Sequence, residues 1–204
     1  MAKIVKLPES TPSKFGHQKA SHRRKKINLE DYGQLNLFDQ IPGGAKIIKM
    51  GHNSLFEEAL LLDEQGDERS KMMYARAIEA GDCIADAFCN LGIIESNSGN
   101  IVKAIDCFTS CLKHDPRHFE AHYNLANIYA DAGNHKLAKL HYEISIQIEP
   151  YFASSYYNLG LVLALDHQYA ASVHALLKYQ ELSSPEEKIN VDDLIKSLQR
   201  SFKN

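Results

Sequence analysis

The sequence predicts an all-α protein built from repeated helical hairpins, and three observations support this prediction. First, three tripeptides recur at a constant spacing: Asn90-Leu91-Gly92, Asn124-Leu125-Ala126 and Asn158-Leu159-Gly160. Second, Gly99-Asn100 and Gly133-Asn134 separate apolar-periodic stretches of about a dozen residues, as the turn of a helical hairpin does. Third, Pro116 and Pro150 follow the second stretch and stop it. A fixed period of about 34 residues indicates a repeat protein.

Three rows of this repeat cover residues 85–118, 119–152 and 153–184. Each row has a small residue in its second helix and a large apolar residue four positions later; these are Ala104, Ala138 and Ser172, then Phe108, Tyr142 and Leu176. Small residues in both helices allow close approach of the two helix axes. A degenerate row, 51–84, precedes them, with Glu57-Glu58 in place of the Leu-Gly pair, as is typical of an end repeat.

Residues 185–204 are predicted to form a C-terminal capping helix. Apolar residues are spaced there as one helical face: Val191, Leu194, Ile195, Leu198 and Phe202. Asn190 is placed to cap this helix. Repeat arrays need such a solvating end.

Residues 1–50 differ from the rest in composition and charge. They contain no repeat, are interrupted by Pro8, Pro12, Pro42 and Gly43-Gly44, and are predicted to be a basic, largely extended or disordered tail. They carry ten Lys and Arg against four Asp and Glu, while residues 51–204 carry thirteen against twenty-two. The overall charge of −3 therefore combines +6 in the tail and −9 in the array.

Composition favours a reducing, cytoplasmic setting. No apolar stretch at the start is long enough for a secretory signal, and none elsewhere for a membrane span. Cys83, Cys89, Cys107 and Cys111 all lie within 29 residues, and a chain with a sizeable core does not need disulfides.

The repeat resembles that of the tetratricopeptide family, whose helix-turn-helix units share its Leu-Gly, Tyr, Gly, Ala, aromatic, Ala and Pro pattern. The resemblance covers residues 51–184 and implies a right-handed α-solenoid. It also implies an interaction scaffold or adaptor, whose first helices line a concave groove for a peptide segment or a partner helix. The groove residues implied are Asn90, Tyr123, Asn124, Asn127, Tyr157 and Asn158.

The asparagines suit peptide binding because a side-chain amide both donates and accepts hydrogen bonds. The alternative is that they cap or bridge neighbouring hairpins. The family's cationic clamp for a C-terminal carboxylate is missing, because positions such as Asp86 and Glu120 are acidic. A neutral or basic partner is therefore expected, and the basic tail is itself such a ligand.

Two tail segments suggest another function, that of a nucleic-acid-associated factor. Arg23, Arg24, Lys25 and Lys26 could contact phosphates or an acidic protein, or be simply solvated. The run Gln34-Leu35-Asn36-Leu37-Phe38 resembles the peptide with which bacterial proteins dock on the DNA sliding clamp. There Leu37 and Phe38 would fill an apolar pocket and Gln34 its rim. Alternatively, Leu35, Leu37 and Phe38 staple the tail to the first hairpin.

The chain is not expected to be an enzyme, and no cofactor or metal is expected. Cys107, Cys111 and His114 share a helical face, but Cys111 falls at a buried repeat position and the chain has no Cys-x-x-Cys pair. It also has no phosphate loop, nucleophile elbow or paired acids. The leading hypothesis is a peptide-binding scaffold, and a third possibility is regulation by a tail that occupies the groove.

Overall fold

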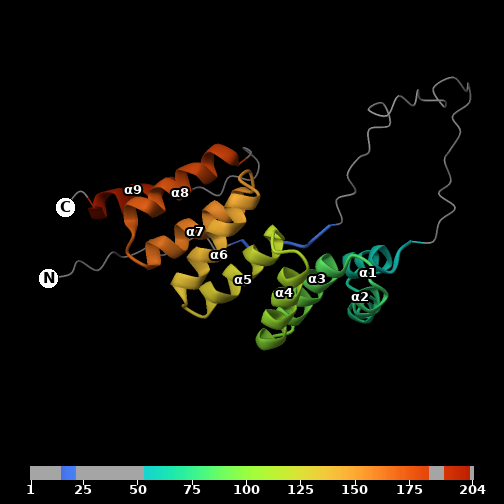
Figure 1. Cartoon of the computed structure of the whole chain (residues 1–204). Coiled ribbons are helices and arrows are strands. Elements are labelled where there is room, and N and C mark those ends of the chain that lie inside the picture. The colour runs from blue at the N-terminus through green and yellow to red at the C-terminus, as the bar shows by residue number, and fades with distance from the viewer. Residues whose placement is uncertain (1–14, 22–52, 184–190, 203–204) are drawn as a thin grey trace, which may run out of the picture. The chain divides into compact units, whose positions relative to one another are not determined.

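The computed structural model describes residues 15–21, 53–183 and 191–202, and every regular element within these ranges is an α-helix (Figure 1). The described helices are α1 (Leu55–Glu64), α2 (Arg69–Ala80), α3 (Ile84–Asn97), α4 (Ile101–His114), α5 (Phe119–Asp131), α6 (His135–Ile148), α7 (Ala153–Leu165), α8 (Tyr169–Leu182) and α9 (Asp192–Phe202). The all-α prediction is confirmed.

The chain divides into two compact units, which are described separately. One unit comprises residues 21–83 and contains α1 and α2. The other comprises residues 1–20 together with 84–204 and contains α3 to α9.

The smaller unit is a single hairpin whose ends are closed by local hydrogen bonds. Ser54 caps α1 through a capping box with Glu57: each side chain accepts a hydrogen bond from the backbone N–H of the other residue. Gly81 ends α2 in the left-handed conformation that glycine adopts without strain. Phe56 and Tyr74, both fully buried, form the centre of its core.

The larger unit consists of three consecutive hairpins, α3 with α4, α5 with α6 and α7 with α8, and α9 packs on α8. The first helices of neighbouring hairpins, α3, α5 and α7, also contact one another. The turns of the first two hairpins contain Gly99 and Gly133, both with φ above +70°. The third turn has His167 at the equivalent position, in the same left-handed region (φ 59°).

Small residues bring the two helices of a hairpin together, as the repeat pattern predicts. A Cβ on Gly92 would lie 2.8 Å from the Phe108 ring, and a Cβ on Gly160 would lie 2.7 Å from Leu176. Phe108 and Leu176 are fully buried, so each occupies the space that the glycine leaves. These contacts set the distance between the first and second helices of these hairpins. They thereby help to position the first helices relative to the rest of the unit.

In the capping region, Val191, Leu194, Ile195 and Leu198 are buried, and they pack in one cluster with Tyr157 and Tyr179. The predicted cap residue Asn190 lies outside the described residues. No helix within the described ranges is both long and apolar enough to cross a membrane.

Candidate peptide-binding site

Three asparagines at equivalent repeat positions lie in one row across α3, α5 and α7. Asn90, Asn124 and Asn158 are each at most 1% exposed. Asparagine is unfavourable inside a helix and costly to bury without partners, so the row needs hydrogen bonds from elsewhere. We call this row the Asn ladder, and the surface of α3, α5 and α7 that carries it the ladder face.

The partners of the Asn ladder belong to residues 15–20 of the same chain, here called the tail segment. Each asparagine accepts a hydrogen bond from the N–H of one tail residue and donates one to the C=O of the same residue. The pairs are Asn158 with Phe15 (2.9 and 3.1 Å), Asn124 with Gln18 (2.9 and 2.8 Å) and Asn90 with Ala20 (2.9 and 2.9 Å). The ladder thus binds main-chain atoms and satisfies its own buried amides.

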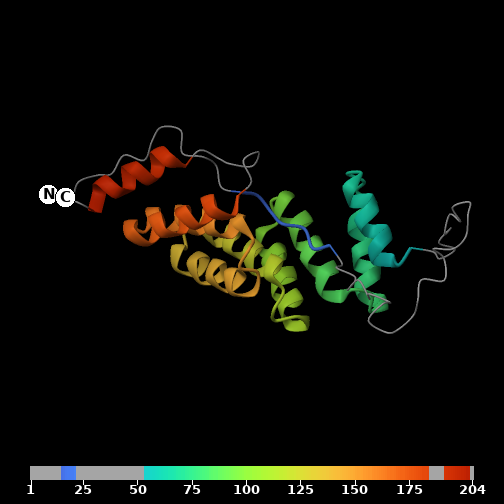
Figure 2. The same cartoon turned by 90° about the horizontal axis from the view of Figure 1, so that it is seen from above.

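The tail segment has no regular secondary structure and crosses the first helices in reverse order. Phe15 lies at α7 and Ala20 at α3, so its N-to-C direction opposes that of the repeats. Figure 2 shows it as the blue stretch that passes from the α7 and α8 hairpin to α3. The arrangement matches the extended ligand that the family resemblance implies.

Further polar side chains bond the tail segment near its Phe15 end. The Tyr123 hydroxyl donates to the Phe15 carbonyl (3.2 Å), and Asn127 donates to the Gly16 carbonyl (3.2 Å). Beneath them, the Tyr142 hydroxyl donates to Oδ1 of Asn127 at 2.5 Å. Burial raises the pKa of Tyr123 and Tyr142, so both phenols remain protonated donors at neutral pH.

An aromatic pocket holds the Phe15 side chain. Its ring meets the Tyr157 ring edge-on, with centroids 5.1 Å apart, and lies 5.9 Å from the Tyr179 ring. Such pairs add to the gain from apolar burial. The Tyr157 hydroxyl is buried with no hydrogen-bond partner within the described ranges, so Tyr157 contributes its ring rather than its polar group.

At the other end, Ala20 is buried in the core of the first hairpin of this unit. It is 1% exposed and belongs to a cluster that includes Cys89, Ile93, Cys111 and Leu125. A methyl group fills the available space, because the surrounding residues are themselves buried. The two ends of the tail segment are therefore anchored by side chains and its length by the Asn ladder.

The acidic residues predicted for this face are largely paired internally. Nε2 of His118 lies 3.0 Å from Oδ1 of Asp86, and its Nδ1 lies 3.3 Å from Oε2 of Glu120. Burial alone would lower the pKa of His118, but the hydrogen bond with Asp86, together with interactions with Cys111 and Glu120, raises it to about 10. A protonated His118 neutralises part of the negative charge at the α3 end of the ladder face.

The buried cysteines lie beside this group. Burial raises the pKa of Cys89, whereas hydrogen bonds with Cys89 and His118 lower that of Cys111 to about 7 although burial opposes them. All four cysteines are free thiols. In the part of the chain that the structure describes, no three His, Cys, Asp or Glu side chains converge to hold a metal ion.

His122 and His141 form a hydrogen-bonded pair in the second hairpin of this unit. Nε2 of His122 lies 3.2 Å from the Pro116 carbonyl, so it carries a proton and donates. Nδ1 of His122 then accepts from Nδ1 of His141, 3.0 Å away. The neutral pair satisfies these contacts, and a proton added at Nδ1 of His122 would place two N–H groups face to face.

We expect the His122–His141 pair to destabilise the fold in mildly acidic solution. Burial lowers both pKa values, that of His141 from 6.5 to about 4, with help from the neighbouring imidazole. Below pH 6.5 the unfolded chain binds protons that the folded chain does not bind, so the free energy of unfolding falls as the pH approaches 4. Partial exposure of His141 limits the loss to about 1–2 kcal/mol.

Urea unfolding at pH 7 and pH 5, followed by circular dichroism, measures this loss. The variant His141→Phe keeps a ring against Tyr129 and should show a smaller decrease between the two pH values. His118 acts with the opposite sign, because its pKa of about 10 keeps the folded chain protonated while the unfolded chain gains that proton only as the pH falls through 6.5. This effect is the same in both proteins and cancels in their comparison. An unchanged decrease in His141→Phe would contradict the assignment.

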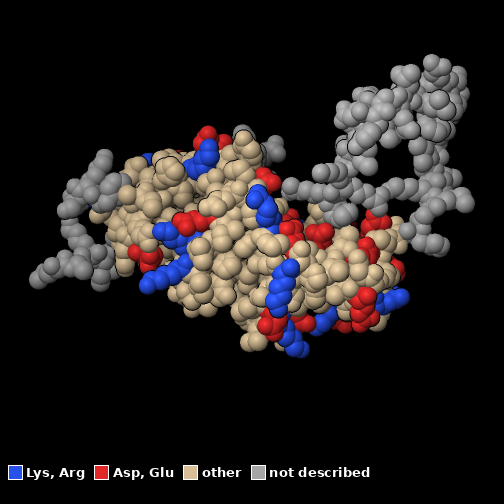
Figure 3. All heavy atoms as spheres, viewed as in Figure 1, with Lys and Arg blue, Asp and Glu red and all other residues tan. Residues whose placement is uncertain are grey.

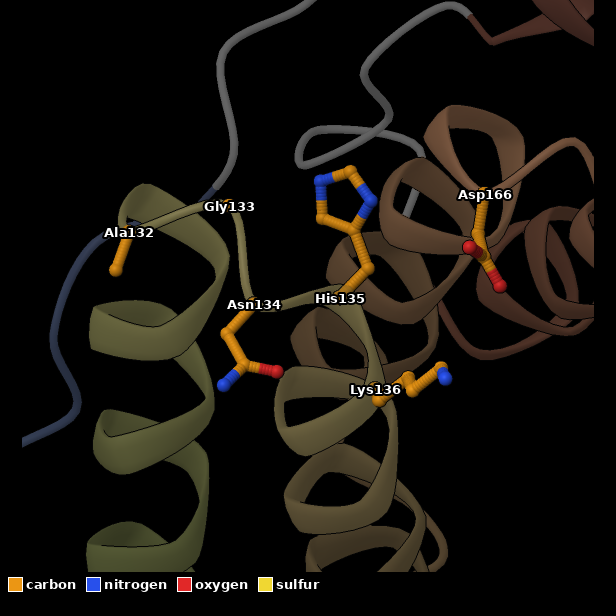
Figure 4. Close-up of a pocket in the computed structure, with 6 residues that line it drawn as sticks. All are labelled: Ala132, Gly133, Asn134, His135, Lys136 and Asp166. Atoms are coloured by element: carbon orange, nitrogen blue, oxygen red, sulfur yellow. The ribbon is translucent and has the colours of Figure 1, made fainter.

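A separate open hollow lies at the turn between α5 and α6. It is lined by Ala132 to Lys136 and by Asp166, as Figure 4 shows, and contains no residue of the Asn ladder. On the face shown in Figure 3, acidic and basic side chains of the described residues are interspersed.

The two predicted motifs of the tail lie outside the described residues. These are Arg23 to Lys26, proposed for phosphates or an acidic partner, and Gln34 to Phe38, proposed for a sliding clamp. Of the predicted groove residues, Asn90, Tyr123, Asn124, Asn127, Tyr157 and Asn158 all contact the tail segment. Phe15 and Ala20, which anchor that segment, were not predicted.

Comparisons with known proteins agree with this architecture. Residues 107–139 match a family model described as tetratricopeptide repeat. MamA from Desulfovibrio magneticus RS-1 is similar in structure, with TM-score 0.58 and 24% identity over 73% of this chain and 89% of that one. A tetratricopeptide repeat protein from Parabacteroides merdae has TM-score 0.61 and 21% identity, covering 74% of this chain and 59% of its own.

A further similar structure is the first tetratricopeptide domain of Spaghetti (RPAP3) bound to the HSP90 peptide SRMEEVD. It has TM-score 0.54 and 15% identity, over 59% of this chain and 94% of that one. A comparison with curated protein sequences finds no match. The repeat period, the paired helices and these matches together show that the chain has the tetratricopeptide fold and contains a tetratricopeptide repeat at residues 107–139.

Proposed function

We propose that this protein is an interaction scaffold whose ladder face binds an extended segment of a partner protein through its main chain. The tetratricopeptide fold is generally a protein–protein interaction module. Its scaffolds are typically non-enzymatic, so the mechanism is equilibrium binding rather than catalysis. In this proposal the chain comprises a tail (1–50), four repeats (51–84, 85–118, 119–152 and 153–184) and a capping helix (185–204), and acts in the cytoplasm.

One observation carries the proposal: three buried amides at repeat-equivalent positions each bond both main-chain groups of one residue in an extended segment. A side chain that only stabilises the array would not need a main chain from outside the helices. Each pair of hydrogen bonds is available to any extended peptide, because main-chain groups are common to all sequences. The expected partner is neutral or basic, since the hydrogen bonds described from the ladder face to the tail segment come from neutral amides and a phenol.

The test uses the full chain with Ala20→Arg, because an arginine has no room at the buried Ala20 position and the tail segment should leave the ladder face. A fluorescent peptide with the sequence of residues 12–23 is then titrated by anisotropy. Adding Asn124→Ala should weaken its binding by about 10- to 100-fold, as expected for two lost hydrogen bonds to a buried group. Asn124 is chosen because, apart from Gln18, it makes only a long contact from Nδ2 to Sγ of Cys89 (3.8 Å) among the described residues, whereas Asn158 also bonds Tyr123 and Asn127.

The matched control is Gln147→Ala, which removes an amide from an exposed position of α6. It should leave peptide affinity unchanged, and circular dichroism should show equal helicity in all variants. If Asn124→Ala binds the peptide as tightly as the control does, the ladder face is not a peptide site and the proposal is wrong.

A second candidate function is autoregulation, in which the tail segment competes with partners for the same face. The observation that favours it is the occupancy itself: residues 15–20 make contacts to all three ladder asparagines. A tethered segment competes at a high effective concentration, so a partner would have to displace it. The expected effect of releasing the tail is argued in the Discussion.

A further inference from the structure

We infer that the ladder face selects partner segments by a spaced pair of side chains: an aromatic residue, and a small apolar residue five positions later. This inference rests on the proposed function and deepens it. The Asn ladder bonds main-chain atoms, so it confers affinity without sequence preference. Preference comes from side chains of the bound segment that pack with the core clusters, as Phe15 and Ala20 do.

The first position requires a large aromatic ring. Phe15 contacts Tyr157 and Tyr179 and packs against two of the core clusters of this unit, which centre on α5 to α8. A smaller side chain would leave a void lined by buried aromatic rings. Phe15 itself is half-buried, and truncation of an aromatic anchor that packs on buried rings weakens binding strongly.

The sixth position requires a small side chain. Ala20 belongs to the same core cluster as Cys89, Cys111 and Ala121, all fully buried, and these residues also form the hairpin core. A leucine here would have to displace helix-packing residues, which costs more than its own burial returns. The alanine position therefore excludes most residue types rather than merely favouring one.

The positions between Phe15 and Ala20 impose weaker or different requirements on the bound segment. A Cβ on Gly16 would meet no atom within 4 Å, and Gly16 is exposed, so this position accepts other residues. Gln18 donates its main-chain N–H to Asn124, which a proline cannot do. Read from α7 toward α3, the recognition pattern therefore has an aromatic residue at the first position and any residue at the second. It excludes proline at the fourth position and requires a small residue at the sixth.

The experiment titrates the full chain carrying Ala20→Arg with four variants of the peptide of residues 12–23. The peptides Phe15→Ala and Ala20→Leu should bind at least about 30-fold and 10-fold more weakly, respectively, than the unaltered peptide. Gln18→Pro should bind at least about 10-fold more weakly. Gly16→Ala should bind within about threefold, as the matched control for one altered side chain.

Each outcome separates the inference from the function on which it rests. If Phe15→Ala and Ala20→Leu bind as well as the unaltered peptide while Asn124→Ala in the protein abolishes binding, the scaffold function stands and the selectivity inference is overturned. If the unaltered peptide does not bind, or binds independently of Asn124, the proposed function fails and the inference fails with it. Loss of binding confined to the three predicted peptides supports both.

Discussion

Replacing Ala20 with arginine in the full chain should raise the affinity of the ladder face for the peptide of residues 12–23 by at least about tenfold. In the unaltered chain the tail segment competes from within the same molecule, at an effective concentration of about millimolar for a flexible tether. A peptide added at micromolar concentration must displace it. An arginine cannot be buried at the 1% exposed Ala20 position, so the variant removes the internal competitor without altering any helix.

Anisotropy titration of the two full-length proteins measures the difference directly. Ser21→Arg is the matched control, because it adds the same charge at the neighbouring exposed residue and should leave affinity near that of the unaltered chain. Equal affinities in the unaltered chain and Ala20→Arg would show that the tail does not compete for the face. Autoregulation would then be excluded, while peptide binding as such would remain.

The repeat array was predictable because it depends on periodic side chains. Asn90, Asn124 and Asn158 recur with the Leu-Gly pair, and the same period places them on one face of successive first helices. The interhelical contacts follow from the same register, since Gly92 and Phe108 are separated as Gly160 and Leu176 are.

The identity of the bound segment was not predictable to the same degree. Charge suggested the basic tail as a whole as a groove ligand, without naming a segment, and the described contacts are made by Phe15 to Ala20. These contacts are mostly to main-chain atoms, which leave no mark on the sequence. Phe15 and Ala20 have no periodic partners in the tail, so their burial could be found only from the fold.

The charge of the ladder face was likewise only partly predictable from the sequence. Asp86 and Glu120 are equivalent repeat positions and were expected to make the face acidic. His118 lies far from Asp86 in sequence, and only the packing of α5 beside α3 brings its Nε2 within 3.0 Å of that carboxylate. Pairwise charge cancellation of this kind depends on tertiary contacts, so a count of acidic residues overestimates the potential.

The largest expected effect on stability is that of Phe108→Ala, which should lower the free energy of unfolding by about 3–5 kcal/mol. Phe108 is fully buried between α3 and α4, and its ring occupies the space beside Gly92. Truncation leaves a cavity that α3 cannot fill without moving Asn90 and Cys89. The reverse change, Gly92→Ala, should cost about 1–3 kcal/mol, because its Cβ would lie 2.8 Å from the Phe108 ring.

The two changes should be coupled, since each alters the same contact. With Phe108→Ala in place, the ring that obstructs a Cβ on Gly92 is gone and alanine regains its helix propensity, about 1 kcal/mol over glycine. The double variant should therefore be more stable than the sum of the two losses predicts, by at least about 2 kcal/mol, which is the relieved clash of about 1 kcal/mol or more plus the regained propensity. Urea unfolding followed by circular dichroism gives all three values, with Thr109→Ala, exposed on α4, as the control. If the two losses were strictly additive, Gly92 would not be required for the packing of the Phe108 ring. The separation of α3 and α4, which sets the position of Asn90, would then depend on other contacts.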